Sequence, residues 1–281
     1  MQTGQPSRTA LGAAGHRAAH QVLEQGRIFF DPLALRILGS EAEEALNEAE
    51  QEPRKRALRL FIAVRTRFAE DALAAAVARG VSQLVVLGAG LDTYAYRSNL
   101  QDRLRVFEVD HPATQAWKRE QLAKASIAVP GALTFAPVDF ERDTLADGLA
   151  AAGFDPHQQT FFTWLGVTPY LTESAVFATL GFIAALPGGA HVVFDYSNPP
   201  DSIVGVERRA FHEALATRVA AAGETFKSYF GSEALVVRLA DLGFRDIEDL
   251  GPPEIAARYF PNHAGGPSGG GGAHIIRAAT R

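Results

Sequence analysis

Short apolar runs alternate with segments of helix-forming residues between residues 83 and 196, and this alternation constrains the fold more than any other feature of the chain. Each run is bounded by turn residues, as is typical of a buried strand. Repeated strand–helix–strand units with right-handed crossovers build an open parallel sheet with helices on both faces. The expected strands are 83–87, 104–109, 133–138, 160–165 and 191–196. Two later runs, 243–250 and 274–279, are expected to form an antiparallel pair joined by a loop, which completes a mostly parallel, seven-stranded α/β sheet.

The first 80 residues are rich in helix formers and predict several helices before the sheet. In the last of them, apolar residues recur at spacings of three and four, so one stripe should face a core while its basic neighbours face solvent. We expect a helical lid over residues 1–80 and a core over residues 81–281, with a helical insertion after about residue 200. The stripe comprises Leu58, Phe61, Ile62, Arg65, Phe68, Ala69 and Leu73, and the basic residues are Arg54, Lys55, Arg56 and Arg59.

The first expected strand runs directly into Gly88-Ala89-Gly90. Glycines at this point form a tight turn, and their missing side chains let a ligand approach backbone N–H groups near a helix N-terminus. The dinucleotide fingerprint would need a third glycine at the position of Thr93. The turn therefore favours a nucleoside without a pyrophosphate, and a nicotinamide-dependent oxidoreductase is kept as an alternative.

The next two expected strands end in acidic residues, at the carboxyl edge where open α/β sheets bind ligands. Glu108 and Asp110 share one face because strand side chains alternate, so one can accept both hydroxyls of a ribose while the other orients the loop. Asp110 can instead cap the helix that begins at Pro112. Asp139 and Phe140 suit an adenine ring, whereas Asp139 alone can equally form a turn.

Charge and composition exclude several classes of function. A net charge of −5 repels a phosphate backbone, so nucleic acid is not an expected partner. The absence of cysteine excludes a disulfide framework and a thiol nucleophile and agrees with a reducing cytoplasm. No apolar run is long enough for a membrane span, and residues 1–20 lack the apolar stretch of a signal peptide. His16 and His20 have a spacing that can hold a metal, but no third ligand accompanies them, so we expect no metal site.

Several motifs follow one another in a fixed order along about residues 15–200. They are Arg65-Thr66-Arg67, the run from Leu87 to Thr93, the run from Phe107 to Pro112 with Lys118 after it, Val138-Asp139, and the run from Gly166 to Thr172. This ordered set resembles the leucine carboxyl methyltransferase family of class I S-adenosylmethionine-dependent methyltransferases. The resemblance implies a Rossmann-like fold, S-adenosylmethionine as cofactor with S-adenosylhomocysteine as product, and methyl transfer to a carboxylate or hydroxyl oxygen of a small molecule such as a secondary metabolite.

The same resemblance implies which residues bind the cofactor. The glycine turn would lie against the methionine part of the cofactor, and two arginines are candidates to bind its carboxylate. The acidic residue at the end of the second expected strand would bind the ribose, and the one at the end of the third would bind the adenine. These residues are, in chain order, Arg17, Arg65, Gly88, Ala89, Gly90, Asp110, His111, Asp139 and Phe140. Many members of the family have an acidic residue beside the sulfonium where this chain has Leu165, whose backbone carbonyl can take over that contact.

The acceptor determines whether a general base is needed. A carboxylate is already ionised at neutral pH, whereas a phenol or alcohol benefits from a base. Tyr170 is the candidate catalytic residue, as a hydrogen-bond partner of the acceptor or the cofactor, and packing alone is its alternative role. His111 can serve as a base or as a helix cap. The missing acidic residue at Leu165 also leaves open a non-catalytic protein that binds S-adenosylmethionine and regulates a partner.

Overall fold

The computed structural model describes residues 8–139, 142–221, 223–261 and 272–280. Among these residues, seven strands form one sheet in the order β3-β2-β1-β4-β5-β7-β6. The pairs β1/β2, β2/β3 and β4/β5 are parallel, and β7 runs antiparallel to both β5 and β6. The predicted α/β fold, with a mostly parallel seven-stranded sheet closed by an antiparallel pair, is therefore confirmed. No helix within the described ranges is long and apolar enough to cross a lipid bilayer.

The chain divides into two compact units, a first unit that ends at Asp155 and a second that begins at Pro156. The helices that precede residue 80 belong to the first unit together with the first three strands. Whether these helices act as a lid, and whether residue 80 is a functional boundary, stay predictions.

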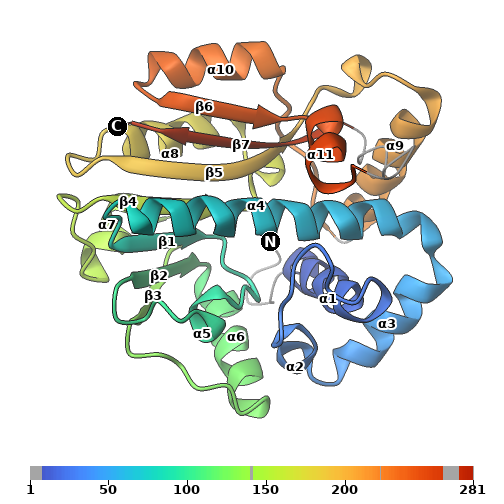
Figure 1. Cartoon of the computed structure of the whole chain (residues 1–281), viewed down its shortest axis with the longest axis horizontal. Coiled ribbons are helices and arrows are strands. Elements are labelled where there is room, and N and C mark those ends of the chain that lie inside the picture. Colours follow the sequence, from blue (N-terminus) through green and yellow to red (C-terminus); the bar gives the residue numbers. More distant parts are fainter. Residues whose placement is uncertain (1–7, 140–141, 222, 262–271, 281) are drawn as a thin grey trace. The chain divides into compact units, whose positions relative to one another are not determined.

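In the first unit, the strands form the buried centre, and the helices form where the local sequence favours them. β1 is buried along its whole length, as expected for an inner strand of a parallel sheet. Helix α1 packs against α2, α3 and α4 (Figure 1). The elements are α1 (Arg8–Leu23), α2 (Ala34–Leu38), α3 (Glu41–Gln51), η1 (Pro53–Lys55), α4 (Arg56–Ala78), β1 (Gln83–Leu87), α5 (Tyr94–Arg97), β2 (Arg105–Asp110), α6 (Pro112–Lys124), β3 (Leu133–Pro137) and α7 (Leu145–Ala151).

The apolar stripe of α4 is buried as predicted, with Leu58 only half-buried at its end. The prediction that the neighbouring basic residues face solvent was wrong for two of them. Arg59 is buried and donates two hydrogen bonds of 2.8 Å to the Glu24 carboxylate, and Lys55 is buried beside Glu48 and Glu52. These carboxylates neutralise the charges, so the two basic side chains can leave water.

In the second unit, β5 lies between β4 and β7, and β6 pairs with the far side of β7. The elements are β4 (Thr160–Trp164), η2 (Thr168–Tyr170), α8 (Glu173–Ala184), β5 (Ala190–Ser197), η3 (Pro200–Ser202), α9 (Val206–Ala221), α10 (Ser232–Asp241), β6 (Arg245–Leu250), α11 (Pro252–Tyr259) and β7 (Ala273–Ala279). Only a loop was expected between the last two strands, but α11 forms there with proline at its first turn, where no hydrogen bond is lost.

Helix α7 has a glycine where its neighbour leaves no room for a side chain. A Cβ added at Gly148 would overlap Cγ2 of Val138, which is fully buried directly after β3. The absent side chain therefore sets how closely α7 approaches the end of β3.

We expect Gly148→Ala to lower the free energy of unfolding by about 1–3 kcal/mol through overpacking, although alanine is the better helix former. In a Val138→Ala background the same change should be neutral or stabilising, because the clashing methyl group is gone. Urea denaturation of the four proteins measures this coupling. Gly181→Ala in α8 is the matched control, since its Cβ would meet only Leu242 at 4.0 Å; equal costs in both backgrounds would exclude the clash.

Candidate functional site

The carboxyl ends of β1, β2 and β3 are joined by backbone hydrogen bonds. The amides of Gly88 and Ala89 donate to the Val109 carbonyl at 2.8 and 3.1 Å. The amide of Val138 donates to the Asp110 carbonyl at 2.9 Å. The loops that follow these three strands therefore start from one fixed edge, which is where open α/β sheets bind ligands.

The glycine turn has a backbone that other residues rarely adopt. Gly88 and Gly90 have φ values of +66° and +43°, in the left-handed region that favours glycine. A Cβ at Gly90 would lie 2.9 Å from Cβ of Ala10, so the start of α1 closes over this residue. Ala89 between them is buried.

Asp110 connects this turn to the loop after β2. Its Oδ2 accepts the Gly90 amide at 2.6 Å, and its Oδ1 accepts the His111 amide at 2.7 Å. Burial raises the pKa of Asp110, and the two amides and the Lys118 charge oppose that rise. Each carboxylate oxygen has a second lone pair, so both can still accept a hydroxyl group from a ligand.

His111, rather than Asp110, caps helix α6. The His111 Nδ1 accepts the Ala113 amide at 3.2 Å, so the capping role considered for Asp110 is wrong. In this geometry the neutral imidazole carries its proton on Nε2. His111 is half-buried beside Asp110.

Glu108 has a different environment from Asp110, although both lie on one face of β2. Glu108 is fully buried, with its Oε2 2.7 Å from Nζ of Lys118 and accepting the Tyr96 hydroxyl at 3.2 Å. Burial raises the pKa of Glu108 to about 7 despite the opposing charge of Lys118. Of the two carboxylates, Glu108 holds buried side chains in place, and Asp110 lies at the carboxyl edge of the sheet. Lys118 is buried as well, because this carboxylate balances its charge.

Asp139 is the second residue after β3 and forms a turn. Its carbonyl accepts the amides of Arg142 and Asp143 at 2.8 and 2.7 Å, and its amide donates to the Asp143 carboxylate at 3.1 Å. Its half-buried carboxylate lies 3.8 Å from Nε of Arg142. Phe140, the other residue expected at the adenine, lies outside the described residues.

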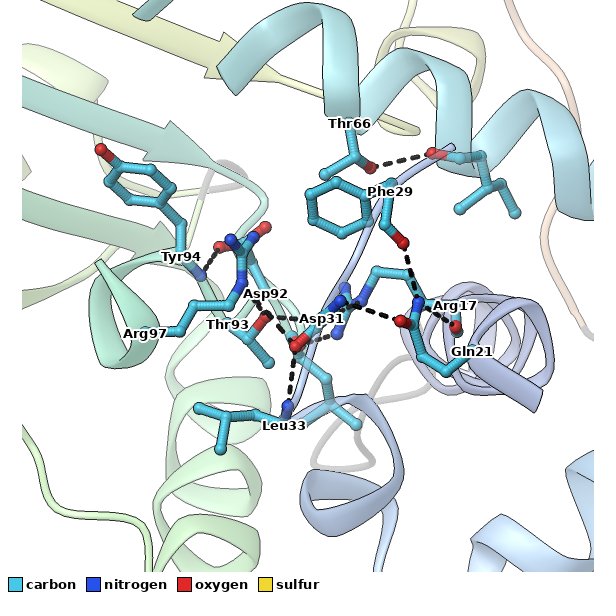
Figure 2. A network of polar contacts seen from close by, with 12 residues as sticks. Arg17, Gln21, Phe29, Asp31, Leu33, Thr66, Asp92, Thr93, Tyr94 and Arg97 are labelled. Atoms are coloured by element: carbon cyan, nitrogen blue, oxygen red, sulfur yellow. Dashed lines mark hydrogen bonds and ion pairs between the residues drawn. The ribbon is translucent and has the colours of Figure 1, made fainter. Parts of the chain in front are cut away.

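Arg17 belongs to a buried network around Asp31 (Figure 2). Its Nε donates to the Asp31 carboxylate at 3.1 Å and its Nη2 to the Leu91 carbonyl at 2.6 Å. Asp31 also accepts the Thr93 hydroxyl at 2.7 Å, and its second oxygen lies 3.7 Å from Nε of Arg97. This network fixes α1 to the segment that follows the glycine turn.

The sequence gives little sign of this network. Arg97 donates to both Glu70 oxygens and so joins α4 to α5. A charged residue at the boundary of predicted helices was the only available signal, because the partners are far apart in sequence.

Arg65 lies in the buried stripe of α4, with its guanidinium carbon 5.9 Å from the centre of the Phe61 ring. Arg67 is exposed and donates to Asp71 at 2.7 Å, one turn along the same helix. Of the two arginines of this motif, only Arg65 is buried.

The remaining two predicted site residues lie in the second unit. Leu165 is half-buried directly after β4, and the amide of the next residue, Gly166, donates to the Asp195 carboxylate at 2.5 Å. Tyr170 is half-buried, and its ring centre lies 5.5 Å from that of Phe226. Both residues follow the carboxyl end of β4, which ends one residue earlier than the expected strand 160–165.

The glycine turn, the acidic strand end and the β4 loop fall within one family signature. The model of the leucine carboxyl methyltransferase family matches residues 10–184. The chain belongs to this family. Membership of this family confirms that the chain is a methyltransferase whose cofactor is S-adenosylmethionine. The relatives described below are named as S-adenosylmethionine-dependent methyltransferases too.

Two relatives and one solved structure illustrate the similarity. A Bacillus subtilis protein named "Putative S-adenosyl-L-methionine-dependent methyltransferase YktD" is 35% identical over 77% of this chain and 71% of that protein. A protein of the same description from Frankia alni is 38% identical, over 63% of this chain and 64% of the relative, which is less than two thirds of its length. The crystal structure of a protein described as a putative methyltransferase, from Thermobifida fusca, covers 99% of this chain and 96% of its own, with a TM-score of 0.51 and 18% identity. It supports the fold.

Replacing Lys118 by Met should leave the buried Glu108 carboxylate without its cation. Near pH 8 we expect the free energy of unfolding to fall by about 3–5 kcal/mol. The pKa of Glu108 is about 7 in the folded protein against an ordinary value of 4.5, so this group's contribution is full below 4.5 and is lost as pH rises. Without Lys118 that pKa rises further, and the deficit should therefore be smaller near pH 6 than near pH 8.

Urea denaturation at the two pH values measures this deficit. Lys124→Met, at the exposed end of the same helix, is the matched control and should change little. A deficit of the same size at both pH values would show that Lys118 acts through packing rather than through the charge of Glu108.

Proposed function

We propose that this methyltransferase transfers the methyl group of S-adenosylmethionine to a carboxylate or hydroxyl oxygen of a small molecule. The observation that carries the proposal is the Asp110 carboxylate, half-buried at the edge of the sheet and hydrogen-bonded to the glycine turn. The net charge of −5 argues against a nucleic-acid acceptor and favours a small molecule. The cysteine-free composition agrees with a cytoplasmic enzyme.

The polar groups of the first unit fit the cofactor's chemistry. A ribose diol needs acceptors, and Asp110 retains lone pairs for both hydroxyls. The cofactor's carboxylate needs a cation, for which Arg65 is our candidate. Arg17 is a second candidate whose Nε and Nη2 are already bound to Asp31 and Leu91. The glycine turn leaves room for close approach, and Asp139 can accept from the exocyclic amine of adenine.

When bound, the cofactor supplies an electrophilic methyl group on a sulfonium. The protein's own residues then need to bind, orient and exclude water, because an in-line displacement gains most from positioning. No side chain has to form a covalent intermediate. Tyr170, on the loop after β4, is our candidate for a hydrogen bond to the acceptor or the cofactor.

A non-catalytic role is the second candidate function, and one residue favours it. Leu165 has no charge to place beside a sulfonium, whereas many family members have an acidic side chain there. Methylated product from any acceptor excludes this alternative.

The first test is titration calorimetry with S-adenosylmethionine and S-adenosylhomocysteine, with NADH as the control. We expect micromolar binding of the first two and none of NADH. Binding of NADH alone would contradict the proposal, and binding of neither methyl donor nor product would exclude a working cofactor site.

Asp110→Ala should weaken binding of S-adenosylhomocysteine by about 1–3 kcal/mol, because a buried hydroxyl pair loses its acceptor. The same calorimetric titration measures it. Asp102→Ala, which changes an exposed carboxylate in the loop before β2, should leave the affinity unchanged. Equal affinity of the two variants would remove Asp110 from the site.

Arg65→Ala should weaken S-adenosylhomocysteine binding more than Arg67→Ala. Arg65 is buried and is the candidate cation for the cofactor's carboxylate, whereas Arg67 is exposed and paired with Asp71. An affinity loss of about tenfold or more is expected for Arg65→Ala alone, since hydrogen bonds to charged groups contribute about 1.5–3 kcal/mol. The opposite order would assign the contact to Arg67.

A further inference from the structure

An aromatic cluster in the second unit comprises Tyr170, His212, Phe226 and Tyr229. The His212 and Phe226 rings are stacked with centres 5.9 Å apart, and the Tyr229 ring meets His212 edge-on at 5.5 Å. Phe226 also contacts Tyr170 at 5.5 Å. The cluster thus joins α9 and the segment before α10 to the loop that follows β4.

Hydrogen bonds hold this cluster at the carboxyl end of β4. The amide of Lys227 donates to the Pro169 carbonyl at 2.7 Å, and the Ser228 hydroxyl donates to the Thr168 carbonyl at 2.9 Å. The Thr168 hydroxyl in turn donates to the Asp195 carbonyl in β5. The segment with Phe226 and Tyr229 is therefore fixed to the strand edge where ligands of open α/β sheets bind.

His212 is a costly residue for its position. It is only 4% exposed, and Val219 is the only other side chain of the described part of α9 that is buried. Its Nε2 lies 3.3 Å from the Tyr229 hydroxyl. An apolar residue would fill the same space without desolvating an imidazole, so packing alone does not account for a histidine here.

The ionisation of this pair suits proton acceptance. Burial lowers the pKa of His212, an effect that neighbouring Glu213 opposes, so the imidazole is neutral at pH 7. Burial raises the pKa of Tyr229, so its hydroxyl keeps its proton. In the tautomer with a proton on Nδ1, the His212 Nε2 accepts the Tyr229 hydroxyl.

We propose that this cluster binds the methyl acceptor, that the acceptor is a phenol, and that Tyr229 and His212 take up its proton. The proposal rests on the proposed function and deepens it by naming the acceptor class. An aromatic acceptor can stack against the exposed parts of the Phe226 and Tyr170 rings. A carboxylate acceptor would need no base, so the histidine favours a hydroxyl group.

The step balances with these groups alone. The phenol oxygen forms a bond to the methyl carbon, and the carbon–sulfur bond of the sulfonium breaks with its electron pair left on sulfur. The phenol proton passes to the Tyr229 oxygen as the Tyr229 proton passes to the His212 Nε2. The products are an aryl methyl ether, S-adenosylhomocysteine and a protonated His212, which then loses its proton to solvent.

The first measurement needs no turnover. The protein saturated with S-adenosylhomocysteine is titrated with 4-methylphenol and with 4-methylbenzoate, and the imidazole resonances of His212 are followed by NMR. We expect the phenol to bind and shift these resonances, and the benzoate to leave them in place. The variant His157→Asn, which lacks an exposed histidine, identifies imidazole resonances that do not belong to His212. Failure of S-adenosylhomocysteine to bind would contradict the proposed function itself, whereas its binding without any phenol effect would overturn only the assignment of the acceptor.

The second measurement uses a panel of phenols and benzoates with matched ring substituents, and mass spectrometry distinguishes ether from ester products. With 4-methylphenol near pH 7, His212→Gln should lower the rate by about 10²–10⁴-fold, the usual contribution of a general base. Tyr229→Phe should have a comparable effect, and the double variant should be little worse than either, since both act in one relay. Tyr259→Phe in α11 is the matched control.

The pH profile distinguishes a base from a packing role. Wild type should be flat above the lowered pKa of His212. His212→Gln should instead gain rate up to the phenol's own pKa of about 10, and 4-nitrophenol, which ionises near neutrality, should restore most of its activity. Ester products without ethers, phenol methylation insensitive to both variants, or no methylation of any phenol by protein that binds S-adenosylmethionine would overturn the proposal. If His212→Gln does not fold, Tyr229→Phe alone decides.

Discussion

The bond from the Gly90 amide to the Asp110 carboxylate, at 2.6 Å, ties together the first two loops of the sheet edge. It holds the glycine turn in a left-handed backbone while the second oxygen of the same carboxylate accepts the His111 amide. The carboxylate therefore organises the backbone before any ligand arrives. Asp110 can both order the backbone and bind a ligand, because the lone pairs that remain on its two oxygens are those that a ribose diol requires.

Ion pairs with little exposure to solvent form the next layer of the first unit. Glu108 lies against Lys118, Asp31 between two arginines, Glu70 against Arg97 and Glu24 against Arg59. Burial opposes ionisation of Glu24, yet hydrogen bonds from His20 and Arg59 lower its pKa to about 2. Such pairs contribute little net stability compared with apolar packing, but removing one partner is expensive. They therefore fix which segments lie together: α1 is held to the segment that follows the glycine turn, and α4 is held to α5.

Periodicity and turn residues were enough to predict the strands, because a strand of a parallel sheet is apolar along its whole length and bounded by turns. The tight turn at Gly88 and Gly90 and the position of Asp110 at the end of β2 were predictable for the same local reason. The burial of Arg59 and Lys118 was not predictable, because a basic side chain is buried only where a carboxylate pairs with it. The partner of Arg59, Glu24, lies 35 residues away in the sequence. Helix α11 was missed because its turn-forming start, Gly251-Pro252, also marks the end of a strand. Sequence patterns report a residue's neighbours along the chain and not its partners across it.

Residues of the second unit bear on two separate questions: what lies beside the sulfonium, and which group accepts the methyl. Leu165 removes a carboxylate from the loop after β4, and nothing acidic in the described part of that loop, residues 165–172, replaces it. In the same unit, a neutral imidazole is buried among aromatic rings and bonded to a phenolic hydroxyl. A carboxylate acceptor arrives ionised and needs neither feature, whereas a phenol must lose a proton of pKa about 10 as it is methylated. The cost of desolvating His212 is understandable if it takes up that proton, as we propose.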